Sequence, residues 1–321
     1  MPYPVQVTPS PGTGLSYVIT KDGRVWLFDG STVAGAPSLD ISDLVLNKGE
    51  QGLLSIAVHE LDSTRVFLHY TANDGDTVVA EYQFQNGALD PDSAQVLLRL
   101  GQPASNHNGG MIQLGTDGRL YVGLGDGGGS NDQFNNGQNL DSLLGGLVAI
   151  DIDTGQTELF SSGLRNPWRF WIEDDDVYIA DVGQNKFEEV SVSPLAQGTN
   201  YGWPITEGLH CFRPSSGCDV GGQTLPLVEV AHGDAGTCSI TGGLVYRGEM
   251  IPEITGHYFY SDYCGGYLRS FIVESDAVVE EVDWTGQVGV PGRIVGFGVD
   301  ARGEMYVMTP STLFRVVGIR D

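Results

Sequence analysis

The sequence predicts an all-β protein, folded as a six-bladed β-propeller that takes up residues 1–321 as a single domain. Three observations favour this fold. Apolar residues alternate with a period of two in most segments, which is typical of strands. Segments with the apolar spacing of a helix are nearly absent. A phrase that begins with a turn and continues with alternating apolar and aromatic residues occurs six times in 321 residues, or roughly fifty residues per copy, which suits a four-stranded propeller blade.

The copies of this phrase mark the expected blades in chain order. They are 22-DGRVWLF-28, 63-STRVFLHYT-71, 117-DGRLYVGLGD-126, 174-DDDVYIADVG-183, 256-GHYFYSDYCGG-266 and 302-RGEMYVMT-309. Further strands are expected between the copies, at 78–84, 146–152, 243–248 and 312–319. We expect the two chain ends to share one blade, and the inserts 126–145 and 199–240 to be loops on one face.

Charge and hydropathy exclude several classes of partner. The formal net charge is −25, from 41 acidic and 16 basic residues, so the protein repels nucleic acid and anionic membrane surfaces. No apolar run approaches the ~20 residues that a membrane-spanning helix needs, and we expect no membrane insertion. A hydrophobic content of 40% with 18% charged residues is typical of a globular protein. The sequence carries no signal for an oligomeric state.

All four cysteines lie in one loop-rich segment. They are Cys211, Cys218, Cys238 and Cys264, and none forms the C-x-x-C pair typical of zinc sites. We expect two disulfides, Cys211–Cys218 and Cys238–Cys264, although four cysteines permit three pairings. Disulfides are typical of oxidising compartments. We therefore expect an extracytoplasmic protein, periplasmic or secreted, whose signal peptide has been removed, because the start MPYPVQV lacks a basic and then apolar pattern.

The segment 106-NHNGGMIQLGTDGRLYVGLGD-126 predicts a hairpin with a histidine at its entrance and an aspartate at its exit. The Asp-Gly pair at 117–118 is typical of a two-residue turn. In the resulting register His107 and Asp126 are diagonal neighbours on one face of the sheet. A carboxylate at that distance orients an imidazole, and the surrounding glycines would leave open space beside it, as a general base needs. The alternative is a structural His–Asp bond that ties the end of the hairpin.

A second polar segment follows at 163-GLRNPWRF-170. Pro167 holds Arg165 off a helical path, and we expect its guanidinium to clamp an anion or to pair with a surface carboxylate. The loop 183-GQNKFEE-189 offers carbonyl and carboxylate oxygens, which are ligands that calcium prefers. The loop 126–141 is also rich in oxygen atoms. Either loop is a candidate for Ca²⁺, and the alternative is an ordinary turn.

Several phrases in order make the chain resemble a known family. They are EQGLLSIAVHE, NHNGGMIQLGTDGRLYVGLGDGG, GLRNPWRF, IADVGQNKFEEV, NYGWPITEG and TGGLVYRG. They resemble the soluble glucose/aldose sugar dehydrogenase family, whose members are quinoproteins that use pyrroloquinoline quinone (PQQ) and calcium on a six-bladed propeller. The resemblance covers residues 15–310. The cysteine-containing segment is similar to a branch that includes the hedgehog-interacting-protein-like proteins.

This resemblance implies a reaction and a set of catalytic residues. His107 matches the base that takes the proton from the anomeric hydroxyl of the sugar, and Asp126 matches its carboxylate partner. Arg165 and Asn166 match the pair that contacts the quinone, where the arginine stabilises developing negative charge. Hydride transfer from C1 of an aldose to the quinone would give a lactone. The electrons would then pass to an external acceptor.

The resemblance also implies metal ligands and further cofactor contacts. The carbonyls of Gly183 and Gln184 match the ligands of the calcium ion that polarises the quinone. Glu189 and the carbonyl of Tyr201 match a second calcium site found in some members. The remaining cofactor-binding residues that the resemblance implies are Gln51, Thr237 and Arg293.

The chain departs from the family pattern where the carboxylates of PQQ would bind. Glucose dehydrogenases of the family have a lysine at the position of Cys264, and an R-I-R triplet where this chain has Arg293-Ile294-Val295. Each lost charge-assisted contact costs roughly 1.5–3 kcal/mol. PQQ-dependent oxidation of aldoses to lactones is the function expected, and two alternatives remain. One is a calcium-binding propeller without redox chemistry that recognises a carbohydrate or a protein, which the cysteine favours. The other is a metal-dependent lactonase.

Overall fold

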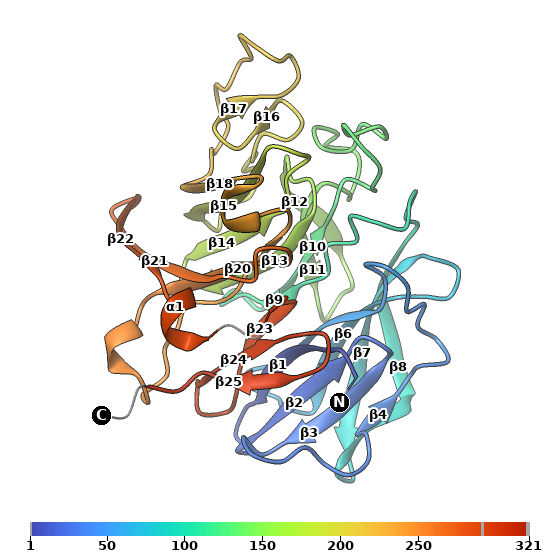
Figure 1. Cartoon of the computed structure of the whole chain (residues 1–321). Coiled ribbons are helices and arrows are strands. Elements are labelled where there is room, and N and C mark those ends of the chain that lie inside the picture. The colour runs from blue at the N-terminus through green and yellow to red at the C-terminus, as the bar shows by residue number, and fades with distance from the viewer. Residues whose placement is uncertain (1, 290–291, 319–321) are drawn as a thin grey trace. The chain divides into compact units, whose positions relative to one another are not determined.

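The computed structural model describes residues 2–289 and 292–318, and this part of the chain is almost entirely β-sheet (Figure 1). Its helical elements are the four-residue α1 (Thr285–Val288) and two 3-10 helices, η1 (Asp234–Gly236) and η2 (Pro252–Ile254). None of these described helices has the length and apolar character needed to cross a membrane. Six sheets of three or four strands follow one another along the chain. They are the blades of a six-bladed β-propeller, so the predicted fold class is confirmed.

Contacts between residues divide the chain into two compact units. The first unit consists of Met1–Gly101, Val245–His257 and Val295–Asp321, and the second of Gln102–Leu244 and Tyr258–Ile294. Each unit contains three of the sheets. That the whole chain is one domain stays a prediction.

The first unit contains the N-terminal and C-terminal sheets, and every neighbouring pair of strands in them is antiparallel. Its first sheet is β1 (Pro4–Ser10), β2 (Leu15–Thr20), β3 (Arg24–Phe28) and β4 (Leu39–Asp40). The next is β5 (Leu53–Val58), β6 (Arg65–Thr71), β7 (Thr77–Gln85) and β8 (Ala88–Leu100). The last is β23 (Gly296–Val299), β24 (Met305–Met308) and β25 (Leu313–Arg315).

The second unit contains the three middle sheets and a small hairpin. The strands of its first sheet are β9 (Ile112–Leu114), β10 (Arg119–Leu124), β11 (Gly146–Asp151) and β12 (Thr157–Ser162). Those of the next sheet are β13 (Pro167–Glu173), β14 (Asp176–Asp181), β15 (Phe187–Pro194) and β18 (Val228–Ala231). The third sheet is β19 (Ile240–Thr241), β20 (Tyr258–Asp262), β21 (Leu268–Glu274) and β22 (Ala277–Asp283), and the hairpin is β16 (Thr206–Glu207) with β17 (His210–Cys211).

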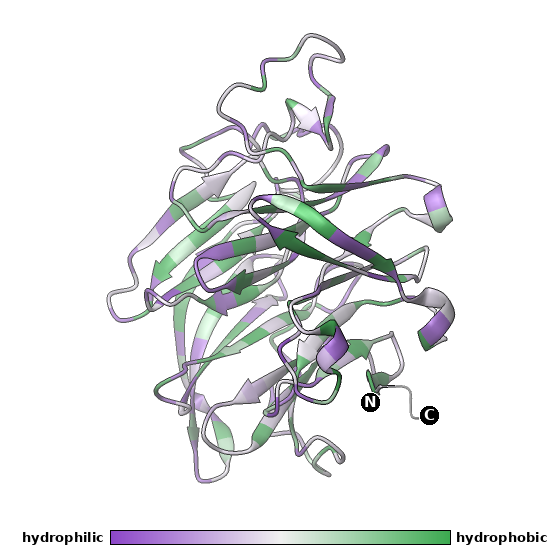
Figure 2. Cartoon of the chain, turned by 90° about the vertical axis from the view of Figure 1, so that its left-hand side faces the viewer, coloured by the Kyte–Doolittle hydropathy of each residue, from purple (hydrophilic) through white to green (hydrophobic). Residues whose placement is uncertain are grey.

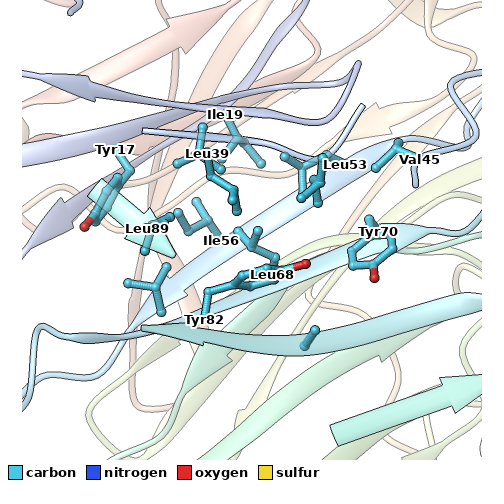
Figure 3. Packing of buried hydrophobic residues seen from close by; sticks show 14 of the residues in the cluster. Tyr17, Ile19, Leu39, Val45, Leu53, Ile56, Leu68, Tyr70, Tyr82 and Leu89 are labelled. Atoms are coloured by element: carbon cyan, nitrogen blue, oxygen red, sulfur yellow. The ribbon is translucent and has the colours of Figure 1, made fainter. Parts of the chain in front are cut away.

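The core of the first unit is shared by two neighbouring sheets (Figure 3). Tyr17 and Ile19 of β2 belong to one buried cluster with Ile56 of β5, Leu68 of β6 and Tyr82 of β7. Burying such a side chain contributes about 1.5–3 kcal/mol. Strand β5 is buried at every residue, whereas the edge strand β22 of the second unit is mostly exposed. Figure 2 shows hydrophobic and hydrophilic residues alternating along several strands.

The recurring sequence phrase marks the sheets correctly. Its six copies contain β3, β6, β10, β14, β20 and β24, and each of these strands belongs to a different sheet. The period-two pattern is a local property of the chain, because side chains of a strand point alternately to opposite faces. Local patterning was therefore enough to count the blades.

The hairpin of β9 and β10 closes with a three-residue turn, and the predicted two-residue turn is wrong. Leu114 lies opposite Leu120, whereas a two-residue turn would have paired Gly115 with Leu120. Gly118 has a φ of 80°, which suits the left-handed residue that ends a three-residue hairpin loop. A register error of one residue moves every side chain to the other face. The argument from alternation that joined the histidine to the aspartate therefore fails.

The prediction that the two chain ends share one blade is wrong. Strand β1 pairs with β2, for example Val7 with Val18, so the first sheet is made from N-terminal residues alone. The last sheet has three strands in the described part of the chain. The ends nevertheless meet, because the backbone N–H of Tyr3 donates to the carbonyl of Pro310 at 3.0 Å.

Both predicted disulfides are confirmed, Cys211–Cys218 and Cys238–Cys264. The insert 199–240 is not all loop, because it contains β16, β17 and β18. Figure 1 shows β16 and β17 on an excursion of the chain that leaves β15 and returns to β18. The insert 126–145 contains no strand or helix. The two inserts are joined by a hydrogen bond from Nη2 of Arg213 to the carbonyl of Asn131, at 2.6 Å.

Candidate active site

The imidazole of His107 is held by the carboxylate of Asp126. Nδ1 of the ring lies 2.6 Å from Oδ1, and both side chains are buried. An ionised carboxylate only accepts hydrogen bonds, so Nδ1 carries the proton and the lone pair of the neutral ring is on Nε2. The same Oδ1 accepts the backbone N–H of Gly128 at 3.0 Å. These bonds thus fix the orientation of the imidazole, as general-base chemistry requires.

The backbone at this contact is strained and closely packed. His107 has a φ of 57°, in the left-handed region, which costs about 1–3 kcal/mol for a residue with a Cβ. A Cβ on Gly125 would lie 2.2 Å from the carbonyl oxygen of His107, and one on Gly109 would lie 2.4 Å from that of Gly123. The prediction that glycines leave open space is therefore wrong. These glycines allow two backbone segments to approach closely. This approach, and not the register of the strands, brings the histidine next to the aspartate.

Arg165 lies beside this pair, in the loop between β12 and β13. Its carbonyl accepts the backbone N–H of Asp126 at 2.8 Å, and its Nη1 donates to the carbonyl of Val182 at 2.8 Å. The neighbouring Asn166 accepts the N–H of Gly109 through Oδ1 at 3.0 Å. The side chain of Arg165 is buried, so it is not one half of a surface ion pair. The structure therefore brings together the predicted base, its carboxylate, the arginine and the asparagine.

A buried aspartate recurs at the end of the second strand, or two residues after it, in each sheet of the second unit. In one sheet Asp181 accepts the backbone N–H groups of Arg165 and Asn166, at 2.8 and 2.6 Å. In another, Asp262 accepts those of Ser239 at 2.6 Å and of Cys238 at 3.0 Å. Each carboxylate fixes the loop that enters the first strand of its own sheet. Asp126 stands at the equivalent position, and it holds an imidazole where the other two hold backbone.

The loop 183–187, whose carbonyls were predicted as calcium ligands, is fixed by Glu207. Oε1 of this buried carboxylate accepts the N–H groups of Asn185 and Lys186 at 2.8 Å each and of Phe187 at 3.3 Å. Oε2 of Glu207 is buried and has no hydrogen-bond partner in the described structure. A Cβ on Gly183 would lie 1.7 Å from the carbonyl oxygen of Phe187, so the turn needs glycine there.

Gln184 and Tyr201 are each anchored by a different partner. Oε1 of Gln184 accepts the backbone N–H of Asn131 at 2.8 Å, which ties this loop to the insert 126–145. The hydroxyl of Tyr201 lies 3.0 Å from Oγ of Ser193, and burial raises the pKa of Tyr201 to about 12. The ring of Tyr201 therefore belongs to the core, and only its backbone carbonyl is suited to the predicted role as a metal ligand.

Glu189 belongs to a group of buried carboxylates. It lies opposite Asp181 in the antiparallel pair of β14 and β15. Burial raises the pKa of Glu189 well above its ordinary value, and the negative charge of Asp181 raises it further. Burial also raises the pKa of Asp181 to about 7, against the lowering effect of its two backbone N–H bonds. A divalent cation next to these groups would offset the repulsion.

Within residues 2–289 and 292–318, one group of three side chains has metal-ligating atoms close enough together to share an ion. It consists of Cys238, Asp262 and Cys264, whose ligand atoms lie within 4.8 Å of one another. Both sulfurs are used in the disulfide. This group is therefore a covalent link with a carboxylate beside it, and we do not assign a metal to it.

The remaining predicted cofactor residues differ in their surroundings. Thr237 is buried beside the disulfide, and its Oγ1 donates to the hydroxyl of Tyr267 at 3.4 Å. Arg293 is exposed and lies over the ring of Tyr263, 5.0 Å from its centroid. Gln51 is buried and belongs to the first unit, whereas the other candidates belong to the second.

Unpaired polar atoms test how well these residues suit a quinone and a metal ion. Nε of Arg165 and both amide atoms of Asn108 are buried and have no hydrogen-bond partner in the described structure. Each such group costs about 1–3 kcal/mol unless a polar ligand pairs with it. The end of the site next to His107 therefore fits the carbonyl oxygens of a quinone. The side chain of Cys264 itself offers no cation for a carboxylate of PQQ, because its sulfur is bonded to Cys238.

A comparison with known families decides the assignment. A sequence model of the glucose/sorbosone dehydrogenase family matches residues 1–315. The chain belongs to this family. Among solved structures, this glucose/sorbosone dehydrogenase family member is similar to the PQQ-bound form of aldose sugar dehydrogenase from Streptomyces coelicolor, with 22% identity and a TM-score of 0.76 over 97% of this chain and 89% of that one. It is also similar to the apo form of the soluble aldose sugar dehydrogenase from Escherichia coli, with 21% identity and a TM-score of 0.79 over 98% of this chain and 95% of that one. At these identities the likeness establishes the fold.

Curated relatives of this family member carry other names. The HIPL1 protein of Arabidopsis thaliana is 30% identical over 311 residues, which are 75% of this chain and 44% of that protein. The Hedgehog-interacting protein of Homo sapiens is 25% identical over 358 residues, covering 94% of this chain and 47% of that protein. The chain thus spans less than half the length of the curated relatives it matches.

Three residues of the family member's site were missed by reasoning from sequence. Asp181 could have been found, because the copy of the phrase in this blade, 174–183, also has an aspartate after its apolar residues, as the copy 117–126 has Asp126. Glu207 gave no signal, since it reaches the loop 183–187 from another segment. Trp203 was not predicted to contact Asp126, and its side chain is 2% exposed. Its indole N–H donates to Oδ2 of Asp126 at 2.9 Å.

Proposed function

We propose that the protein oxidises aldose sugars at C1 to lactones with PQQ as cofactor. The observation that carries this proposal is the buried His107–Asp126 pair, 2.6 Å apart, with Arg165 hydrogen-bonded through its backbone to the same aspartate. It is supported by the family assignment, since a matching family model covers residues 1–315. A strained, buried imidazole with a defined tautomer is costly as a structural tie and well suited to proton abstraction.

The chain's own residues would manage the proton and the charge. His107 accepts the proton of the anomeric hydroxyl at Nε2, and the carboxylate of Asp126 stabilises the imidazolium that forms. Arg165 stabilises negative charge that develops on the acceptor side. PQQ, when bound, supplies the two-electron acceptor for the hydride from C1. The oxidised product keeps its ring as a lactone, and the electrons leave to an external acceptor.

Calcium is proposed at two places in the second unit. Carbonyls of Gly183 and Gln184 would hold the ion that polarises the quinone, in the loop that Glu207 fixes through three backbone N–H groups. Glu189 and the carbonyl of Tyr201 would hold a second ion. The raised pKa of Glu189, caused by burial and by Asp181, supports a cation there.

Reconstitution tests this function. Protein loaded with PQQ and Ca²⁺ should reduce a dye with glucose and other aldoses, and His107→Gln should lower turnover by about a thousandfold or more. His59→Gln serves as the control, because its Nδ1 accepts the backbone N–H groups of Leu61 and Asp62 in a turn. Dye reduction that survives in His107→Gln would rule out the proposed base.

The disulfide at Cys264 favours a second candidate function, a calcium-binding propeller that recognises a carbohydrate or a protein without redox chemistry. Loss of a charge-assisted contact costs roughly 1.5–3 kcal/mol, and the bonded sulfur of Cys264 carries no charge. Binding of PQQ or of a sugar without dye reduction, in protein saturated with Ca²⁺, would support this candidate over the first.

The two disulfides also support a location in an oxidising compartment, outside the cytosol. A sugar and an external electron acceptor are the partners that this function requires. Thiol titration of protein isolated from its natural host under denaturing conditions checks the location, because protein from a reducing compartment would show four reactive thiols in place of none.

A further inference from the structure

We propose that Trp203 is a positioning residue of the active site, and that the loop closed by the Cys211–Cys218 disulfide holds Trp203 in place. The inference deepens the proposed function, because it concerns the base of that reaction. It rests on a chain of contacts within the second unit, which runs from the disulfide through two aromatic rings to the carboxylate of Asp126.

The first step is the bond between the indole and the carboxylate. Nε1 of Trp203 donates to Oδ2 of Asp126 at 2.9 Å, across 77 residues of sequence. The other oxygen, Oδ1, binds Nδ1 of His107 at 2.6 Å and the N–H of Gly128 at 3.0 Å. Both oxygens are therefore committed, which fixes the plane of the carboxylate. Since a hydrogen bond to an ionised group is stronger than a neutral one, the indole holds this plane firmly.

The second step joins the same indole to the cation of the site. The guanidinium carbon of Arg165 lies 5.6 Å from the centroid of the Trp203 ring, within the range of a cation–π interaction. The guanidinium is also bonded to the carbonyl of Val182. One buried side chain thus touches the carboxylate that orients the base and the arginine that would stabilise charge. Its position sets the geometry between the two.

The third step is the support of the indole by the disulfide loop. The ring of Phe212 lies 4.8 Å from that of Trp203, at an angle of 34°. Phe212 follows Cys211 directly, and its N–H donates to the carbonyl of Ile205 at 2.8 Å. The disulfide to Cys218 closes this loop over a separation of seven residues. The loop therefore keeps the ring of Phe212 in contact with the ring of Trp203.

The insert 126–145 also binds the backbone of Trp203. Nε2 of Gln138 donates to the carbonyl of Trp203 at 2.7 Å, and the insert is tied to the disulfide loop by the bond from Arg213 to Asn131. Any buried indole N–H needs an acceptor, and here the acceptor is the carboxylate that orients His107. The arrangement is that of a support for the base.

The experiment replaces Trp203 by phenylalanine, which keeps an aromatic ring and removes the N–H donor. The first readout is the tautomer of His107 in the protein without cofactor, followed by ¹⁵N NMR of histidine-labelled protein. The unsubstituted protein should show the Nδ1–H tautomer, and Trp203→Phe should show a mixture of tautomers. The second readout is dye reduction with PQQ and Ca²⁺, where turnover should fall about tenfold while KM for the sugar stays within about twofold.

Trp171→Phe is the matched control, because this tryptophan of β13 also donates its indole N–H to a carboxylate, Oε2 of Glu173, at 2.8 Å. The control should leave the His107 signals unchanged. Unchanged signals in Trp203→Phe as well would overturn the proposal. If the unsubstituted protein reduces no dye, the proposed function fails, and the NMR readout still decides the role of Trp203.

The role of the loop is tested with the two disulfides. The double substitution Cys211→Ala with Cys218→Ala should shift the His107 signals in the direction of Trp203→Phe, whereas Cys238→Ala with Cys264→Ala should not. Phe212→Leu, which keeps the disulfide and removes the ring contact, should give the same shift. If both Phe212→Leu and removal of the first disulfide leave the His107 signals unchanged, the loop does not hold the tryptophan.

Discussion

Asp181 and Glu189 face each other across the antiparallel pair of β14 and β15, and both side chains are buried. Two carboxylates in such a position repel each other when both are ionised. Burial and this repulsion raise the pKa of Glu189 well above its ordinary value, and burial raises the pKa of Asp181 to about 7. The repulsion is an unfavourable free energy that a bound proton or a divalent cation removes. Two predictions depend on it.

Stability should fall with rising pH when calcium is absent. The ordinary pKa of an aspartate is 3.8, and that of Asp181 is raised to about 7 in the folded chain. Between these values the folded state binds more protons than the unfolded state, so the free energy of unfolding decreases as pH rises through the window. His232, whose pKa is raised by Glu188, acts in the same direction. In a chelator, Tm should fall between about pH 4 and pH 7, and added Ca²⁺ should restore part of the loss at the upper end. A Tm that rises over this range would contradict the assignment.

Glu189→Gln should reveal both the stability that the buried carboxylate costs and its contribution to calcium binding. In the chelator at about pH 8 this variant should be more stable than the unsubstituted protein, because a neutral amide does not repel the carboxylate of Asp181. Its stabilisation by Ca²⁺ should be reduced. Glu253→Gln, at an exposed position of η2, is the control and should change neither value. Thermal unfolding with and without Ca²⁺ provides the measurement, and equal calcium stabilisation in both variants would remove Glu189 from the proposed site.

Asp126→Asn should damage turnover more than stability. The amide can still accept from Nε1 of Trp203, but it presents either a donor or a weaker acceptor to His107, so the proton no longer stays on Nδ1. Turnover with PQQ and Ca²⁺ should drop by about a hundredfold or more, while Tm changes by only a few degrees. Steady-state kinetics and calorimetry on the same sample check both parts. A loss of Tm as large as that of a core truncation would indicate a purely structural pair.

Glu207→Gln should weaken calcium binding without unfolding the hairpin. Its Oε1 fixes Asn185, Lys186 and Phe187 in the loop that was predicted to supply carbonyl ligands. A neutral amide holds these N–H groups less strongly, so the affinity for Ca²⁺ measured by calorimetry should fall about tenfold. Glu229→Gln is matched, because Glu229 accepts the N–H of Leu209 in the same hairpin but makes no bond to the three loop residues. Equal affinities in the two variants would exclude the role of Glu207.

The two disulfides should differ in what they contribute to stability. Their cysteines are separated by 7 and 26 residues, and loop-closure entropy gives about 2.5 kcal/mol for the short loop and about 3.5 kcal/mol for the longer one. Alanine replacement of Cys238 and Cys264 should therefore cost about 1 kcal/mol more than replacement of Cys211 and Cys218. Denaturant unfolding of the two double variants measures the difference, and the reverse order would show that contacts within the folded loops outweigh chain entropy.

Local pattern predicted the blades and part of the site. The phrase with period-two alternation fell in six different sheets, because alternation depends only on the geometry of a single strand. Both cysteine pairs were also predicted correctly. The contact between His107 and Asp126 was expected from the hairpin, but for a reason that failed, since the turn has three residues and not two.

The sequence by itself determined the number of blades and the residue types available for chemistry, since the alternation within one strand depends on neighbours a few positions away. Only the tertiary structure decided that Trp203 binds Asp126, that Glu207 holds the loop 183–187, and that Asp181 faces Glu189. The physical reason is that such contacts join segments that are distant in the sequence. Whether they form depends on the number of residues in each turn and on the glycines that let two backbones come close, and the hydrophobic pattern of a single strand specifies neither. Polar side chains then pair with whatever group that packing brings within about 3 Å.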